Sequence, residues 1–157
     1  MGIPEENFRV DHTSFDDLQY EDGSFDLVFS NEAFLHSADK TALMQNIARL
    51  LRKDGVTVFS DILEAPNVDQ AQLRDVYSRL DLTSMGNHEL YDKTLTAAGM
   101  QRVVKDVDAA PIIKHYGMIL YSATALKRDE LLGPDGVSKE FLEKQIAGLW
   151  KWVECGA

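Results

Sequence analysis

The side chains that could do chemistry are spread thinly along this 157-residue sequence. Its four histidines, at positions 12, 36, 88 and 115, are far apart, and no pair of carboxylates has the spacing of metal ligands. No combination of nucleophile, base and orienting acid is visible. The single cysteine, Cys155, excludes an internal disulfide and a cysteine-based zinc site. The pattern therefore predicts neither a metal centre nor a catalytic triad.

The placement of glycine also bears on chemistry, because closely spaced glycines let a backbone approach a bound nucleotide. The ten glycines stand at positions 2, 23, 55, 86, 99, 117, 133, 136, 148 and 156, and no two of them form a G-x-G pattern. The sequence thus lacks the glycine turn with which dinucleotide-binding folds hold a cofactor.

Length and charge narrow the class of protein. With 45% hydrophobic residues, the chain fits one globular domain over residues 1–157. Its net charge of −10 repels phosphate backbones and anionic lipids, so we expect neither nucleic acid nor a membrane surface as partner. The N-terminus has no apolar signal-like segment, and no stretch approaches the roughly 18 apolar residues of a membrane span. A cytoplasmic protein is expected.

Two strands and one helix form the clearest part of the pattern. Residues 25–30 are nearly continuously apolar, which suits a strand buried on both faces of a parallel sheet. Apolar residues then recur at helical spacing, with Asp39 or alternatively Ser37 as the N-cap and Gly55 as the left-handed residue that ends the helix. Residues 56–62 are β-branched and aromatic, so they predict a second strand. Strand, helix and strand together predict a βαβ unit.

The remainder of the chain is mostly helical in pattern. We expect helices over residues 68–82, 90–98, 112–132 and 138–153, the second closed by Gly99 and the last capped by Ser138. Residues 85–88 and 133–136 predict turns, and residues 101–107 alternate loosely enough to predict a third strand. Trp150 and Trp152 lie two positions apart, so their side chains should point in different directions.

The segment from Leu18 to Asp61 carries a recognisable order of motifs. It reads LQYEDGSFDLVFSNEAFLHSADKTALMQNIARLLRKDGVTVFSD, with a D-G-S-F-D turn, an F-L-H-S segment and a helix that ends A-R-L-L-R-K-D-G. In this order and spacing it resembles the class I S-adenosylmethionine-dependent methyltransferases, from the end of their third strand to the end of their fifth. The segments AFLHSADK, RLDLTSMGNHELYDKTLTAAGM and IIKHYGMI are similar to the sarcosine/dimethylglycine N-methyltransferases, which methylate a small amino acid at nitrogen.

The resemblance implies one group of residues that border the cofactor S-adenosylmethionine. Ser14 and Phe15 match the positions beside the adenine ring, although serine replaces the family's acidic residue, and another register would place Asp11 there. The end of the fourth strand and the histidine after it supply the other positions, namely Ser30, Asn31, Ala33 and His36.

The resemblance also implies residues that face the acceptor amine: Asp61, Met85, Gly86, Tyr91, His115 and Tyr116. Each candidate has a plainer alternative: His36 a packing role under the helix, Asp61 a cap, and His115 with Tyr116 helix packing. Methyl transfer is an in-line displacement that needs positioning and a dry pocket, so no catalytic residue is assigned. Tyr91, His115 and Tyr116 are candidates to bind an acceptor carboxylate.

The resemblance further implies that much of the family's domain is absent. We expect an α/β, partial Rossmann-like sheet with strands three to six of the family order, residues 1–110 forming a remnant core and residues 111–157 the C-terminal helices. The N-terminal half, with the Gly-rich turn and the carboxylate that holds the ribose, has no counterpart. We therefore expect this truncated domain to bind no S-adenosylmethionine alone.

The consequence expected for assembly is an unpaired sheet edge, and such edges pair readily with another chain. The expected partner is a second copy in a homodimer, or the missing half as a separate chain, with a small amine as acceptor. Three functions stay open: part of an N-methyltransferase that is inactive alone, a non-catalytic oligomeric module that binds a small molecule or a protein, and a truncated product without activity.

Overall fold

The computed structural model describes residues 4–105, 110–126, 128–133 and 136–155. The chain divides into two compact units, which are described separately. The first consists of Met1–Leu63 with Met85–Arg102, and the second of Glu64–Ser84 with Val103–Ala157.

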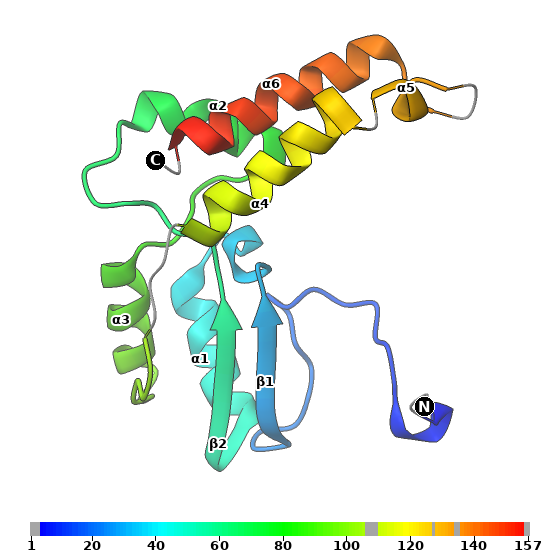
Figure 1. The fold of residues 1–157 in the computed structure, drawn as a ribbon. Helices are drawn as coiled ribbons and strands as arrows, with labels where there is room; N and C mark the ends of the chain where they lie inside the picture. The colour runs from blue at the N-terminus through cyan, green and yellow to red at the C-terminus, as the bar shows by residue number, and fades with distance from the viewer. Residues whose placement is uncertain (1–3, 106–109, 127, 134–135, 156–157) are drawn as a thin grey trace. The chain divides into compact units, whose positions relative to one another are not determined.

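The first unit is built on the predicted βαβ unit, which is confirmed. Strand β1 (Phe25–Asn31), helix α1 (Lys40–Leu50) and strand β2 (Leu51–Ser60) follow one another, and the two strands pair in parallel. Figure 1 shows β1 and β2 side by side with their carboxyl ends at the same edge. Residues that face each other in this register share one face of the sheet, as Leu27 does with Val56.

The ends of α1 confirm one expectation and correct another. Asp39 is the N-cap, because its carboxylate accepts hydrogen bonds from the Thr41 and Ala42 N–H groups. The helix ends at Leu50, and Gly55 is not its left-handed end residue. Leu51 is already extended and pairs with β1, so the strand begins where a last helical turn was expected. The positive φ of 68° falls at Asp54 instead.

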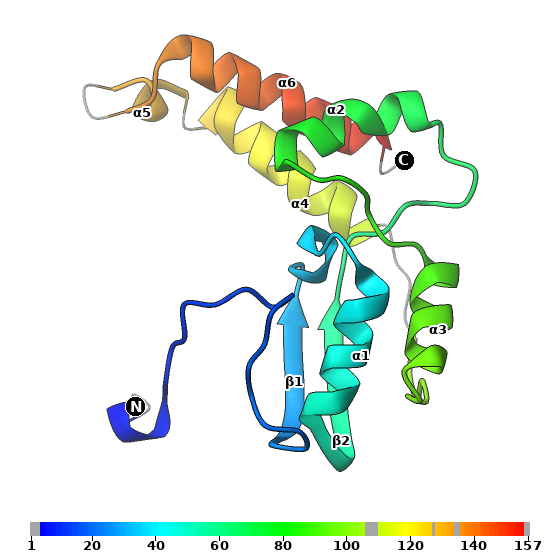
Figure 2. The same ribbon diagram turned by 180° about the vertical axis from the view of Figure 1, so that it is seen from behind.

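The two faces of this sheet differ in what covers them. Val28 and Phe59 pack against the buried cluster, to which α1 contributes Leu43, Met44 and Ile47. Figure 2 shows α1 lying beside the two strands on this side of the sheet. The alternate residues of both strands point to the opposite face, where Leu27 and Phe29 of β1 lie opposite Val56 and Val58 of β2. All four are exposed, so the described residues leave this second face open.

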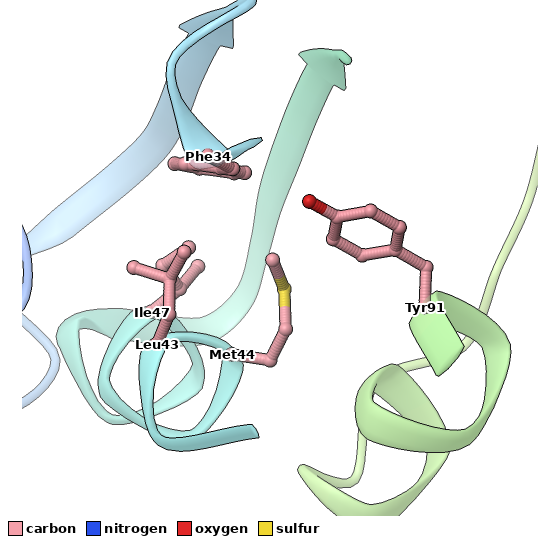
Figure 3. Packing of buried hydrophobic residues seen from close by; sticks show 5 residues of the cluster. All are labelled: Phe34, Leu43, Met44, Ile47 and Tyr91. Carbon is pink, nitrogen blue, oxygen red and sulfur yellow. The ribbon is translucent and has the colours of Figure 1, made fainter. Parts of the chain in front are cut away.

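A small apolar core lies between α1, helix α3 (His88–Ala97) and the short 3-10 helix η2 (Phe34–His36). Figure 3 shows Phe34 and Tyr91 beside three side chains of α1, which are Leu43, Met44 and Ile47. Phe59 joins them, with its ring 5.2 Å from those of Phe34 and Tyr91. This core anchors the turn after β1 to α3.

Two further strands were expected from the family order, the third strand and the sixth, and the prediction over residues 101–107 corresponds to the sixth. Neither is present in the described residues. Apart from a 3-10 turn η1 (Glu5–Asn7), residues 4–24 hold no regular element, and residues 101–105 form no strand. The prediction for 101–107 is therefore wrong over residues 101–105, while 106 and 107 lie outside the described part. A strand needs a neighbour to hydrogen-bond, and the sheet described here has two strands only.

The second unit is helical, with α2 (Gln70–Leu80), α4 (Ala110–Tyr121), the π-helical turn η3 (Ser122–Leu126), α5 (Arg128–Leu131) and α6 (Lys139–Cys155). Helix α6 packs on both α2 and α4, and Tyr116 stacks on Trp152 with ring centroids 4.8 Å apart. No helix in the described ranges is long and apolar enough to span a membrane.

Two expectations for this unit have different outcomes. The single helix expected over 112–132 is wrong, because the α-helix gives way to η3 after Tyr121. The Thr124 hydroxyl donates to the Leu120 carbonyl at 2.7 Å, a side-chain bond of the kind that distorts helices. The opposite orientations of Trp150, which is exposed, and Trp152, which is buried, are confirmed.

Candidate functional site

Polar groups gather where β1 and β2 end, at the carboxyl edge at which open α/β sheets bind ligands. The Ser60 hydroxyl donates to the Asn31 side chain at 2.7 Å, and the Glu32 N–H donates to the Ser60 carbonyl at 2.9 Å. Glu32 has a φ of 50°, so the chain turns sharply away from the sheet just after β1. This turn leads into η2.

Asp61 is the first residue after β2, and it connects two other segments of the site. One carboxylate oxygen accepts a hydrogen bond from the Leu35 N–H at 3.1 Å, and the other accepts one from the Tyr91 hydroxyl. Leu35 belongs to η2 and Tyr91 to α3, so a single side chain joins both elements to the end of the sheet. The Ile62 N–H also donates to this carboxylate, which offers about four lone-pair sites in all.

The surroundings change the acidity of both groups. Burial raises the pKa of the Asp61 carboxyl above its usual value, and this outweighs the opposing effects of the Tyr91 and Leu35 hydrogen bonds and of the Lys40 charge. Burial, together with the hydrogen bond to Asp61, also raises the pKa of Tyr91. The tyrosine therefore keeps its proton at neutral pH and acts as the donor.

The raised pKa of Asp61 predicts a dependence of stability on pH. The folded protein holds this proton more tightly than the unfolded chain does, so the stabilisation is fully present below the usual pKa of 3.8. It is lost as the pH rises through the raised pKa of the folded state. We expect the free energy of unfolding of the natural protein to fall relative to Asp61→Asn over that window. Urea titrations of both proteins across the acidic range measure the difference, and parallel curves would contradict it.

Lys40, which sequence analysis did not single out, is a buried part of the same turn. Its ammonium donates to the Ser37 carbonyl at 2.9 Å and to the Leu35 carbonyl at 3.3 Å. The Ser37 hydroxyl in turn donates to Asp16 at 2.6 Å. Nothing in the spacing of a lysine at the start of an amphipathic helix distinguishes it from a solvent-exposed one, so no sequence signal reveals this role.

The residues predicted to border the cofactor belong to the first unit and lie in or near the turn after β1. Phe15 packs edge-on against Phe34 at 6.5 Å, while Ser14 is exposed and its hydroxyl accepts a hydrogen bond from the Asp16 N–H. Ser30 is buried, and its hydroxyl has no hydrogen-bond partner among the described residues. Asn31 and His36 are exposed, and Ala33 is half-buried. Asp11, the alternative to Ser14, bonds Arg9 and Tyr20.

Gly86 has a clear packing reason to be glycine. It bridges to Leu63, and a Cβ atom there would overlap the Tyr91 ring, whose Cδ2 and Cζ atoms would lie at 3.0 and 3.1 Å. Met85, next to it, is buried. The glycine thus leaves room for the ring that holds Asp61.

We expect Gly86→Ala to push the Tyr91 ring away from Asp61 and to lower the free energy of unfolding by about 1–3 kcal/mol, because added atoms in a packed site force neighbours apart. Urea titration measures the loss. Gly99→Ala is not a suitable control, since Gly99 has a φ of 76°, whereas Gly117→Ala meets no atom within 4 Å. A Gly86 variant as stable as Gly117→Ala would contradict the packing argument.

The two remaining acceptor-side candidates belong to the second unit. Tyr116 stacks on Trp152 and meets His115 edge-on, with ring centroids 5.2 Å apart. His115 is exposed and helps to line a shallow surface depression of about 530 Å³ on α4. The first unit therefore brings together Asp61, Met85, Gly86 and Tyr91, while Tyr116 takes a packing role in the second.

The described residues contain no group of three or more histidine, cysteine, aspartate or glutamate side chains that could hold a metal ion. For S-adenosylmethionine, the observation that bears on the fit is at the carboxyl end of β1, where the buried Ser30 hydroxyl has no hydrogen-bond partner among the described residues. The G-x-G turn is absent from the whole sequence. That this chain alone binds no S-adenosylmethionine stays a prediction.

Comparisons with known proteins agree on one family. Residues 3–59 match the family described as "Methyltransferase domain". A sarcosine/dimethylglycine N-methyltransferase of Halorhodospira halochloris is 31% identical over 153 residues, which cover 94% of this chain and 54% of the relative. A glycine/sarcosine/dimethylglycine N-methyltransferase of Actinopolyspora halophila is 32% identical over 148 residues, which cover 94% of this chain and 26% of that protein.

A solved structure gives the same result. The crystal structure of a Galdieria sulphuraria protein assigned as a sarcosine dimethylglycine methyltransferase superposes with a TM-score of 0.86 and 28% identity, covering 97% of this chain and 55% of that one. The chain thus spans about half the length of the Halorhodospira halochloris and Galdieria sulphuraria proteins. Its α/β fold and its sequence agree, and together they support a class I S-adenosylmethionine-dependent methyltransferase, with a likeness to the sarcosine/dimethylglycine members.

Proposed function

We propose that residues 1–157 form the acceptor-side part of an N-methyltransferase that transfers a methyl group from S-adenosylmethionine to a small amino acid such as sarcosine or dimethylglycine. The observation that carries the proposal is Asp61, a partly buried carboxylate at the carboxyl edge of the sheet. Tyr91 and the Leu35 N–H hold it in place.

Asp61 has the capacity to accept a further hydrogen bond. The Tyr91 hydroxyl and the Leu35 and Ile62 N–H groups leave part of its lone-pair capacity free. The neutral amine of sarcosine has one N–H to donate there, whereas the tertiary amine of dimethylglycine has none and would meet Asp61 without this hydrogen bond. Tyr91 would then act as a positioning residue, because its hydroxyl donates to Asp61. Held in this way, the nitrogen of sarcosine would keep a fixed direction of approach, which is the main requirement of an in-line displacement.

The names of several relatives support a small amine as the acceptor class. They include a dimethylglycine N-methyltransferase of Parasynechococcus marenigrum, 30% identical over 152 residues, and a phosphoethanolamine N-methyltransferase of Arabidopsis thaliana, 28% identical over 87 residues. Both names specify methylation of nitrogen on a small molecule. For this chain we infer the same reaction class, with sarcosine and dimethylglycine as the first substrates to test.

The cofactor is the part of the proposal that needs additional polypeptide. Since the sequence holds no G-x-G turn, we expect residues 1–157 alone to show no binding of S-adenosylmethionine in titration calorimetry. Micromolar binding by this chain would contradict that expectation.

A chimera tests the proposed activity without depending on assembly of separate chains. Residues 1–157 replace the matching 54% of the Halorhodospira halochloris enzyme, and methylated product is measured by mass spectrometry with sarcosine, dimethylglycine or phosphoethanolamine as acceptor. We expect product with one of the first two. A folded chimera that binds S-adenosylmethionine but methylates none of them would overturn the proposal and favour the non-catalytic binding module.

The role of Asp61 has its own readout in this chimera. We expect Asp61→Asn, which keeps the shape of the side chain but removes its charge, to raise KM for the amine with a smaller change in kcat. Asp39→Asn, which alters an exposed carboxylate at the N-cap of α1, serves as the matched control. Equal kinetics for both variants would remove Asp61 from the acceptor site.

A further inference from the structure

Lys40 stands in a place that is unfavourable to a lysine in two respects. Its side chain is only 4% exposed, although an ammonium group leaves water at a high cost in free energy. It is also the first residue of α1, where the positive end of the helix dipole opposes a cation. A methionine has a similar length and would carry neither cost. Where a sequence breaks such rules, the reason is commonly function rather than stability.

The ammonium of Lys40 holds the turn that follows β1. It donates to the Ser37 carbonyl at 2.9 Å and to the Leu35 carbonyl at 3.3 Å. Leu35 lies within the three-residue helix η2, and Ser37 is the residue that caps its end. A single 3-10 turn gains little stability from its own hydrogen bonds, so the side chains that bind its carbonyls determine its geometry.

Leu35 connects Lys40 to the carboxylate of Asp61. The Leu35 N–H donates to one Asp61 oxygen at 3.1 Å, and the Leu35 carbonyl accepts from the Lys40 ammonium. These two backbone groups flank one α-carbon, so a displacement of the carbonyl also turns the N–H. Leu35 is itself buried, and hydrogen bonds linked in this way inside a protein strengthen one another.

Charge is a second link between the same two side chains. Burial raises the pKa of the Asp61 carboxyl, and the Lys40 charge acts against burial by favouring the ionised form. Among the described residues, the other titratable group that acts on Asp61 is Tyr91 of α3, whose hydroxyl donates to the second carboxylate oxygen. Tyr91 keeps its proton at neutral pH and brings no charge. Lys40 therefore supplies the positive charge that faces this carboxylate.

We propose that Lys40 is a positioning residue for the acceptor amine: by holding the backbone of Leu35, it fixes the direction in which the Asp61 carboxylate receives the amine. The inference rests on the proposed role of Asp61 in binding the amine. Lys40 acts through Leu35 and Asp61 and does not itself touch the amine, so it is not a catalytic residue.

Ser37 offers a matched control in the same turn. Its side chain is 1% exposed, and its hydroxyl donates to Asp16 at 2.6 Å. Ser37→Ala therefore removes one buried hydrogen bond of the turn and leaves both backbone bonds of Leu35 in place. A lysine whose role is only to stabilise the turn would behave like Ser37 in the measurements below.

The titration of Asp61 tests the link in residues 1–157 without any methyl transfer. NMR of the side-chain carboxyl carbon follows Asp61 in the natural protein, in Lys40→Met and in Ser37→Ala. We expect the titration midpoint to rise in Lys40→Met, because the nearby positive charge is removed, and to stay unchanged in Ser37→Ala. Equal midpoints in all three proteins would overturn the proposal.

Kinetics of the chimera test the effect on the amine. We expect Lys40→Met to raise KM for sarcosine roughly tenfold, equivalent to about 1.4 kcal/mol, with a smaller change in kcat. In a chimera that already carries Asp61→Asn, the same change should alter KM little, because the two side chains act through one another. Ser37→Ala should leave KM within about twofold of the natural value.

The outcomes separate the role of Lys40 from the proposed function. If Lys40→Met does not fold, Lys40→Gln, which keeps N–H donors but removes the charge, takes its place in both experiments. KM increases that multiply in the double variant, or that Ser37→Ala repeats, would overturn the role of Lys40 alone. A chimera that methylates no amine overturns the proposed function instead, and the titration of residues 1–157 then still decides whether Lys40 acts on Asp61.

Discussion

Replacing Asp61 with alanine is expected to lower the free energy of unfolding by about 2–4 kcal/mol, because it removes the acceptor of two hydrogen bonds at once. The donors left behind, the Leu35 N–H and the Tyr91 hydroxyl, belong to buried residues. Each unsatisfied donor costs about 1–3 kcal/mol, and release of the partly buried charge offsets some of that loss.

The measurement should report on the first unit directly. Hydrogen exchange followed by mass spectrometry gives the local opening free energy of peptides from η2 and α3, and urea titration followed by circular dichroism gives the global value. Asp61→Asn is the control, since its amide still accepts from Leu35 and bonds Tyr91, and it should cost about 1 kcal/mol or less. An alanine variant no less stable than the asparagine variant would show that the two hydrogen bonds contribute little.

Replacing Met44 with alanine is expected to destabilise the protein by about 2–5 kcal/mol. Met44 is completely buried in the small core between α1, η2 and α3, so the shortened side chain leaves a cavity that its neighbours fill only in part. With few residues in this core, Phe34 and Tyr91 lose part of their packing too. The change should therefore also loosen the turn after β1.

Gln45 provides the comparison for Met44, because it is the next residue on α1 and its side chain is exposed. Gln45→Ala should stay within about 0.5 kcal/mol of the natural protein. The hydrogen-exchange rates of α1 peptides in both variants measure how much each substitution destabilises the helix. If the two substitutions have equal effects, the core around Met44 is not what holds α1 on the sheet.

The βαβ unit could be predicted because its signals are local. Apolar runs, helical spacing and the capping side chain of Asp39 all lie within the segments that they specify, and each agrees with the structure. The end of α1 was misplaced because Gly55 is a common helix stop, whereas pairing of Leu51 with Phe25 across the sheet decided the boundary. That pairing is a tertiary effect, to which local propensity is blind.

The candidate site could be predicted only in part, for the same reason. Asp61 and Tyr91 were named from a family resemblance, but their mutual hydrogen bond joins residues 30 positions apart. Lys40 escaped notice and Ser37 was named only as an alternative N-cap, because their partners are carbonyls and a carboxylate set by the course of the backbone. Residues 101–105 show the converse: their alternation suits a strand, yet a strand forms only where a neighbour offers hydrogen bonds.

The hydrogen bonds of Asp61 also have a consequence for the order of folding. They span 26 and 30 positions of the chain, so each closes a long loop whose entropy must be lost before the bond forms. The contacts within α1 are local and form early by comparison. We therefore expect the carboxyl edge of the sheet to assemble late, and during synthesis only after Tyr91 has left the ribosome. Until then the turn after β1 is exposed together with the open face of the sheet, where Leu27, Phe29, Val56 and Val58 lie, which makes the nascent chain a natural client of chaperones.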